Sequence, residues 1–232
     1  MTDSYLLHNG TRVYTDSDER PSLASFMLAY FAQQNGSKKI LELCSGAGAV
    51  SFWNYDRGFR GRTVMVDLRE DQLKLAERTA AEGGFDVTAV KADAATYRSR
   101  ERFDCVICNP PFFDEKDRSE DPDRNAVRHE NGLSPDALFA SAAMNLKQRG
   151  HLFICHVPDR LPDLFESLRK NGFEPKTLRF CRHSAERLPF LVLIDAIYKG
   201  GKKLTVMPDL CVFSSDGKYT DELMDICEED YV

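Results

Sequence analysis

KKILELCSGAGAV, at residues 38–50, contains the stretch that sets the fold class of this chain. Its first part, KKILELC, is a short apolar run rich in β-forming residues, and SGAG at 45–48 follows at once. The two glycines allow a tight turn, and the residues around 49–57 are patterned as a helix. The stretch therefore predicts a strand, a turn and a helix, the unit from which doubly wound α/β proteins are built.

The same alternation continues on both sides of this stretch. Further strands are expected at 63–68, 86–93, 103–108, 151–157, 176–181 and 190–198, and helices at 22–34, 70–84, 134–150 and 161–171. Strands that are apolar on both faces and alternate with helices imply a mostly parallel sheet. We expect an α/β fold with a seven-stranded, mostly parallel Rossmann-like sheet and helices on both faces. The last two strands lack a helix between them, which predicts an antiparallel edge strand.

Domain organisation follows from where this pattern begins and ends. Residues 1–37 are expected to form an irregular lead-in followed by one helix. Residues 38–200 are expected to form the main domain, and 201–232 a charged C-terminal extension. Within the main domain, the segment 113–133 is long, charged and rich in turn-forming residues, which is typical of functional loops.

Composition places the chain among ordinary globular proteins. It has 232 residues, with 31 Lys and Arg against 37 Asp and Glu, and 42% hydrophobic residues. No apolar window is long enough for a transmembrane helix, and the polar, acidic start lacks the order of a secretory signal. The odd number of cysteines, seven, favours reduced thiols in the cytoplasm. The net charge of −6 excludes a generally basic nucleic-acid coat protein but allows a local basic face.

Cys105 and Cys108 have the CxxC spacing of many zinc sites. No second pair follows at zinc spacing, and both cysteines lie in one apolar run. We therefore expect no metal. Because no apolar window could span a bilayer, we also expect no membrane partner. The sequence leaves the oligomeric state open.

The turn after the first strand has the features of a nucleotide site. Gly46 and Gly48 let a ligand lie against the backbone. Asp67 comes 19 residues after Gly48 at the end of the next strand, where such folds place a carboxylate against a ribose. A dinucleotide site would want a third glycine where Ser51 stands. Glu42 suits a ligand with a cationic amine, and S-adenosylmethionine (SAM) has that amine, a ribose and an adenine.

Asn109-Pro110-Pro111-Phe112 ends the apolar strand FDCVIC. The prolines remove two N–H donors and leave carbonyls that project, and Asn109 adds a side-chain carbonyl. Two such oxygens can accept both hydrogens of an amino group on a planar ring that stacks on Phe112. This grip returns the nitrogen lone pair for attack on a methyl sulfonium, so these four residues are predicted to be catalytic. The plainer interpretation is a turn that only ends the strand.

ELCSGAG, VDL, KADA and CNPPF, in this order and spacing, resemble the SAM-dependent class I methyltransferases that act on amino groups. Within that class, NPPF-F followed by a charged loop and Val127-Arg128-His129-Glu130 resembles the bacterial tRNA (adenine-6-amino) methyltransferases of the valine-tRNA type. The resemblance covers roughly residues 25–200, and the segment 204–220 is similar to that family's C-terminal end.

The resemblance implies a role for each matching residue. The implied cofactor set is Glu42, Ser45, Gly46, Gly48, Asp67, Leu68, Asp93, Ala94 and Asn109. The residues up to Gly48 would line the methionine part, Asp67 would hold the ribose, and Asp93 with Ala94 would read the adenine. Phe113, Arg128 and His129 would bind the substrate beside the catalytic turn.

Two positions depart from the family pattern, and they keep alternatives open. Tyr is more common than Phe at position 112, and Phe there also occurs in enzymes that methylate the 2-amino group of guanine in ribosomal RNA. Cys44 stands where glycine is common. The leading hypothesis is methylation of the 6-amino group of an adenine in a tRNA anticodon loop. The alternatives are the guanine enzyme, a protein glutamine amide methyltransferase and a nucleotide-binding regulator without turnover.

An RNA substrate requires a local basic patch on this acidic chain. The candidate groups lie beside the catalytic turn, in the connection between the last two strands, and in the tail. They are Arg124, Arg128, His129, Arg179, Arg182, His183, Arg187, Lys199, Lys202 and Lys203. Any one of them taken alone is better explained as a solvated surface charge. The connection at 182–187 should pass near the same sheet edge as Asn109.

Overall fold

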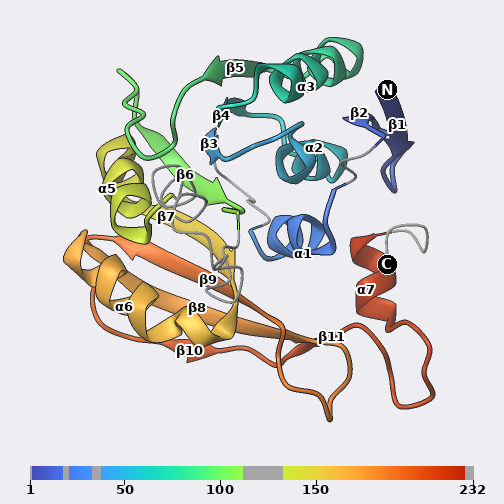
Figure 1. Cartoon of the computed structure of the whole chain (residues 1–232), viewed down its shortest axis with the longest axis vertical. Helices are drawn as coiled ribbons and strands as arrows, with labels where there is room; N and C mark the ends of the chain where they lie inside the picture. The colour runs from blue at the N-terminus through green and yellow to red at the C-terminus, as the bar shows by residue number, and fades with distance from the viewer. Residues whose placement is uncertain (1, 18–20, 33–37, 112–132, 228–232) are drawn as a thin grey trace, which may run out of the picture.

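The computed structural model describes residues 2–17, 21–32, 38–111 and 133–227. Within these ranges a nine-stranded sheet forms the centre of the protein (Figure 1). Its strands follow the order β10-β8-β9-β7-β6-β3-β4-β5, and β11 also pairs with β8. The strand bounds are β3 (Lys39–Leu43), β4 (Arg62–Asp67), β5 (Val87–Lys91), β6 (Phe103–Cys108), β7 (Leu146–His156), β8 (Phe173–Arg182), β9 (Leu191–Tyr198), β10 (Thr205–Val206) and β11 (Leu210–Cys211).

The strand order reverses between β3 and β6. The chain runs outward from β3 to β4 and β5, and then returns to place β6 on the other side of β3, with all of these strands parallel. At the reversal Leu43 is paired with Cys108, so the residues that follow β3 and β6 leave the sheet side by side. Open α/β sheets bind their ligands at such a reversal.

The seven predicted strands correspond to β3–β9, and the predicted α/β class is confirmed. The count of seven was too low, because β10 and β11 add two short parallel strands beyond β8. The antiparallel strand is β9, but it lies between β7 and β8 and not at the edge. The helix predicted at 134–150 was too long, since Leu146 already pairs with Phe103 as the start of β7.

Helices cover both faces of the sheet, as predicted (Figure 1). Along β3 the apolar side chains alternate, so Ile40 joins one buried cluster while Leu41 and Leu43 join the other. The first cluster is closed by α1 (Leu23–Phe31), α2 (Ala49–Asp56), α3 (Glu70–Gly83) and α7 (Asp221–Ile226), and the second by α5 (Pro135–Asn145) and α6 (Leu161–Lys170), which follows the 3₁₀ turn η2 (Pro158–Arg160). In the described ranges, none of the helices has the length and apolar character needed to cross a membrane.

The tail from β10 to α7 packs on this framework. Arg179 of β8 donates hydrogen bonds to the Pro208 carbonyl at 3.0 Å and to Glu222 of α7 at 2.7 Å. At the C-terminal end of α7, the Trp53 indole N–H donates to the Ile226 carbonyl at 2.8 Å. The described part of the extension is therefore held to α2 and to the edge of the sheet.

The N-terminal segment is a β-hairpin, not the irregular lead-in predicted from the sequence. Strands β1 (Thr2–Leu6) and β2 (Arg12–Asp16) pair in antiparallel register. The hairpin loop is fastened to Asp56 at the end of α2, which is only 9% exposed. Its carboxylate accepts hydrogen bonds from the backbone N–H of Asn9 at 2.9 Å, from that of Thr11 at 3.1 Å, and from the Asn9 side-chain amide at 3.2 Å.

Replacing Asp56 by Ala should loosen this hairpin. We expect Asp56→Ala to lower the free energy of unfolding by about 2–4 kcal/mol, because three donors lose one shared charged acceptor. Urea unfolding followed by circular dichroism measures the loss. The control variant Asp56→Asn keeps one acceptor and should lose less. Equal stability of wild type and Asp56→Ala would contradict this account.

Candidate functional site

The two turns singled out in the sequence lie next to each other at the carboxyl edge of the sheet. Because Leu43 is paired with Cys108, Cys44 and Asn109 leave neighbouring strands in the same direction. The ends of β4 and β7 flank them on either side. Motifs that are far apart in the sequence therefore form one site.

The turn after β3 has a left-handed backbone at three alternate residues, with φ of 57° at Cys44, 53° at Gly46 and 85° at Gly48. A Cβ on Gly48 would lie 2.7 Å from the Phe52 ring, so packing against α2 also requires glycine there. A Cβ on Gly46 would meet nothing within 4 Å, so the turn opens onto space that a ligand can fill. Cys44 takes this conformation without being glycine, at a cost of about 1–2 kcal/mol.

Asp67 connects this turn to the end of β4. One carboxylate oxygen accepts the Gly46 N–H at 2.8 Å, and the other accepts the Arg69 N–H at 2.9 Å. Each oxygen keeps further acceptor capacity, so the oriented carboxylate can take hydrogen bonds from a diol such as a ribose. Beside it the large apolar side chain of Leu68 is 64% exposed.

Asp93 and Ala94 extend the same edge at the end of β5. The Asp93 side chain is exposed, and its Oδ1 accepts the Ala95 N–H at 2.8 Å. Ala94 is buried. The acidic and glycine residues predicted to hold the cofactor thus lie along the carboxyl ends of three adjacent strands, β3, β4 and β5.

Glu42 is buried in β3, directly below the turn. Its carboxylate accepts hydrogen bonds from the Ser51 hydroxyl and from the Ser51 N–H, the latter at 3.2 Å. Burial raises the pKa of Glu42 to about 7, and the negative charge of Asp67 adds to the rise, while the Ser51 hydrogen bonds oppose it. Because a positive charge stabilises the ionised form, this carboxyl suits a cationic partner such as the SAM amine.

Asn109 follows β6 and is held from two sides. Its side-chain nitrogen donates to the Ser25 hydroxyl of α1 at 2.9 Å. Its side-chain oxygen accepts the Cys155 S–H of β7 at 3.0 Å. Pro110 is buried and Pro111 is exposed. Sequence reasoning missed Ser25 and Cys155, because nothing local connects them to Asn109.

A cavity of about 130 Å³ opens beside the two prolines, between β7 and the helices α5 and α6. Its walls are mostly apolar, with two basic side chains. The lining residues are Pro110, Pro111, Leu133, Pro135, Leu138, Phe139, Ile154, His156, Arg160 and Leu164. A cavity of this lining suits a planar base.

His156 is the lining residue whose chemistry is most sharply defined. Its Nδ1 accepts the Val157 N–H at 2.9 Å. Burial lowers the pKa of His156, and Arg160 contributes to the lowering, while the Val157 hydrogen bond opposes it. The neutral imidazole therefore carries its proton on Nε2, which makes Nε2 a hydrogen-bond donor.

Four predicted site residues, Phe112, Phe113, Arg128 and His129, lie outside the described residues, as does Arg124. Among the other basic candidates, Arg179 is 6% exposed and paired with Glu222, so it is a structural group and the prediction of an RNA contact there was wrong.

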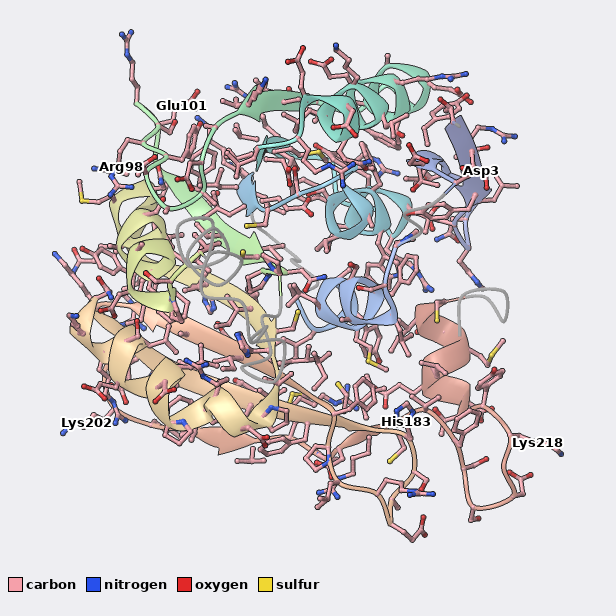
Figure 2. The ribbon with its side chains drawn as sticks, in the orientation of Figure 1. Asp3, Arg98, Glu101, His183, Lys202 and Lys218 are labelled. Atoms are coloured by element: carbon pink, nitrogen blue, oxygen red, sulfur yellow. The ribbon has the colours of Figure 1, made fainter. Side chains whose placement is uncertain are left out.

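The remaining basic candidates lie at two opposite edges of the sheet. His156 is paired with Val192 in the β7–β9 register, so the connection at 183–190 lies at the same edge as Asn109, as predicted. Lys199 follows the other end of β9, near the start of β8, and is remote from the site. Figure 2 shows His183 and Lys202 at opposite ends of this part of the molecule.

The CxxC pair does not form a shared site. Cys105 packs in one hydrophobic cluster and Cys108 in the other, because residues three apart on a strand point to opposite faces. Both thiols are buried, and burial raises their pKa.

Comparison with known proteins agrees with this geometry. A family model described as "Methyltransferase small domain" matches residues 12–162, more than half of the chain. A tRNA1(Val) (adenine(37)-N6)-methyltransferase from Tolumonas auensis is 26% identical over 213 residues, which cover 90% of this chain and 88% of the relative. A relative with the same description from Pseudoalteromonas translucida is 22% identical over 213 residues, covering 91% of this chain and 90% of the relative.

Solved structures share the fold. A predicted O-methyltransferase from Agrobacterium tumefaciens superimposes with a TM-score of 0.68 at 18% identity, covering 88% of this chain and 94% of that one. The T. thermophilus 16S rRNA N2 G1207 methyltransferase, in complex with AdoMet and guanosine, superimposes with a TM-score of 0.57 at 16% identity, covering 85% of this chain and 50% of that one.

The reversed sheet, the glycine turn and the family match together define a class I SAM-dependent methyltransferase. Within that class, the chain belongs to the methyltransferase small domain family. Three groups at this edge fit SAM. The buried carboxyl of Glu42 suits its amine, and the oriented carboxylate of Asp67 suits its ribose. The open side of Gly46 leaves space for the ligand to lie against the backbone.

The pKa of Glu42 makes SAM affinity depend on pH. At pH 6 most of this carboxyl is protonated, and ionising it on binding a cationic amine costs free energy. We expect SAM to bind about tenfold more weakly at pH 6 than at pH 8, measured by titration calorimetry. Glu42→Gln should bind more weakly at pH 8 and lose this dependence. If SAM affinity depends on pH equally in the wild type and in Glu42→Gln, Glu42 does not bind SAM.

Proposed function

We propose that this protein transfers a methyl group from SAM to the 6-amino group of an adenine in the anticodon loop of a tRNA. The observation that carries the proposal is the pairing of Leu43 with Cys108, which sets the glycine turn beside the Asn109-Pro110 end of β6. The adenine N6 activity named for the relatives supports the target. A cytoplasmic location belongs to the same proposal, since tRNA is the substrate.

The chain's residues act by holding an aryl amine, whose lone pair is otherwise delocalised into the ring. When bound, SAM supplies a sulfonium methyl group, and transfer leaves a thioether while the amine gives up one proton. The side-chain oxygen of Asn109 and the carbonyl oxygen of Pro110 accept the two amine hydrogens and so return the lone pair to the nitrogen. In this proposal SAM is held by Glu42, Ser45, Gly46, Gly48, Asp67, Leu68, Asp93 and Ala94, and Asn109 is shared between the cofactor and the target amine.

The cavity beside Pro110 and Pro111 supports a planar base as the target. Its lining is mostly apolar, and its volume is about 130 Å³. The adenine N6 activity named for the relatives favours adenine over guanine as that base.

The RNA itself is proposed to cross the sheet edge at the connection 183–190. This segment carries His183 and Arg187 and lies at the same edge as Asn109. Phe112, Phe113, Arg128 and His129 are proposed to stack on the target base and to contact its neighbours. The anticodon loop is single-stranded, so extruding the base costs less than in a duplex.

Asn109→Ala tests the amine grip. We expect this variant to lose methyl transfer by about 100-fold or more, since one of the two acceptors that prepare the nitrogen is gone. Its SAM affinity should change little. Labelled SAM with tRNA as substrate measures turnover, and calorimetry measures binding. Asn171→Ala, which removes an amide at the end of α6, serves as the control. Near-normal turnover of Asn109→Ala would contradict the proposed mechanism.

Identifying the product tests the substrate. The protein is incubated with labelled SAM and total RNA from cells that lack it, and the RNA is digested and analysed by mass. We expect N6-methyladenosine in the tRNA fraction. N2-methylguanosine in ribosomal RNA would establish the guanine alternative, and methylated glutamine in a cell extract would establish the protein alternative.

A further inference from the structure

The amine grip depends on which way the Asn109 side chain faces. Rotating the amide by half a turn exchanges its oxygen, an acceptor, with its nitrogen, which carries two donors. A rotated amide would direct N–H groups at the target amine and repel it. The reaction therefore needs neighbours that distinguish the two ends of the amide before substrate binds.

Ser25 contacts the nitrogen end. Its hydroxyl lies 2.9 Å from Asn109 Nδ2 and 3.2 Å from the hydroxyl of Ser22, the N-cap of α1. The Ser22 oxygen is also the acceptor for the Ser25 N–H, at 3.3 Å. Either hydroxyl of this pair can be the donor, and when Ser25 gives its hydrogen to Ser22 it keeps only lone pairs for the amide N–H. Ser25 is 8% exposed, and the helix residues that follow it, Phe26 and Met27, are fully buried.

Cys155 contacts the oxygen end. Its sulfur lies 3.0 Å from Asn109 Oδ1, near the carboxyl end of the interior strand β7. Burial raises the pKa of this thiol, so it stays protonated and can donate. A thiol is a weak donor, so Oδ1 keeps most of its acceptor strength and a second lone pair for the target amine. The rotated amide would have to donate to sulfur, which is a poor acceptor.

We propose that Ser25 and Cys155 are positioning residues that fix the direction of the Asn109 amide. This inference rests on the proposed function and extends it to a helix that lies 84 residues away from Asn109 in the sequence. Ser25 acts through Asn109 and touches neither the methyl donor nor the base. By binding the nitrogen of the Asn109 amide, its hydroxyl leaves the amide oxygen to accept from the target amine.

Activity measurements separate positioning from folding. We expect Ser25→Ala to lower the single-turnover rate of methyl transfer by about 10- to 100-fold, with SAM affinity unchanged. Ser25→Thr keeps the hydroxyl and should recover most of the rate. The control is Ser141→Ala, which removes another buried helical serine that donates to the Tyr97 carbonyl at 3.1 Å. Ser141→Ala should methylate at the wild-type single-turnover rate, although it should lose about as much folding stability as Ser25→Ala.

A second background makes the test specific to the direction of the amide. In Asn109→Asp the side chain carries two oxygens, so rotation no longer changes which atom meets the amine. Ser25→Ala should therefore cost little further rate when combined with Asn109→Asp. An equal cost of Ser25→Ala in both backgrounds would overturn the proposal.

Nuclear magnetic resonance gives a readout that needs no RNA. In protein labelled with ¹⁵N-asparagine, the Asn109 side-chain signals are those absent from Asn109→Asp. We expect one set of signals with slow hydrogen exchange in the wild type, and faster exchange or doubled signals in Ser25→Ala. Signals that do not change would overturn the orienting role. A wild type that keeps these signals but methylates no RNA would instead overturn the proposed function, and with it the role of Ser25 in turnover.

Discussion

The parallel pairing of β3 with β6 is the constraint on which the rest of the site depends. It places Leu43 opposite Cys108, so SGAG and Asn109-Pro110-Pro111 extend from adjacent strand ends. Helices bury both faces of these strands, so the positions of the turns are set by the sheet and not by loops. The ends of β4 and β5 then supply acidic groups on one side, while β7 borders the cavity on the other.

Several features of this edge lower the stability of the fold and are compensated locally. Cys44 is held in a left-handed conformation that costs about 1–2 kcal/mol. Glu42 is a carboxyl without a cation among its described contacts, in a place where burial favours its neutral form. Ser51 donates to Glu42, and Gly46 donates to Asp67, so each acid has partners without a ligand. The buried Glu42 carboxyl lowers the stability of the fold at the place where a cationic ligand with hydroxyl groups would stabilise it.

The sequence was sufficient where a feature depends on local pattern, and insufficient where it depends on distant contacts. Apolar runs and glycine stops located β3–β9, and strand ends located Glu42, Asp67 and Asn109. The N-terminal hairpin was missed because its strands are mostly polar and its loop is fastened by Asp56, 47 residues from Asn9. β10 and β11 are two residues each, too short for any periodicity. The roles of Phe112, Phe113, Arg128 and His129 stay predictions, as do the domain boundaries at 37 and 200.

Helix α1 shows why the missed contacts matter most. It precedes the first parallel strand and carries none of the family motifs, yet it meets both halves of the site. Through Ser25 it holds the amide of Asn109, and through the edge-to-face contact of Tyr30 with Trp53, at 6.2 Å between ring centres, it packs on α2. Helix α2 begins at the glycine turn and donates from Ser51 to Glu42. One rigid helix thus links the group that would hold the target amine to the group that would face the cofactor amine.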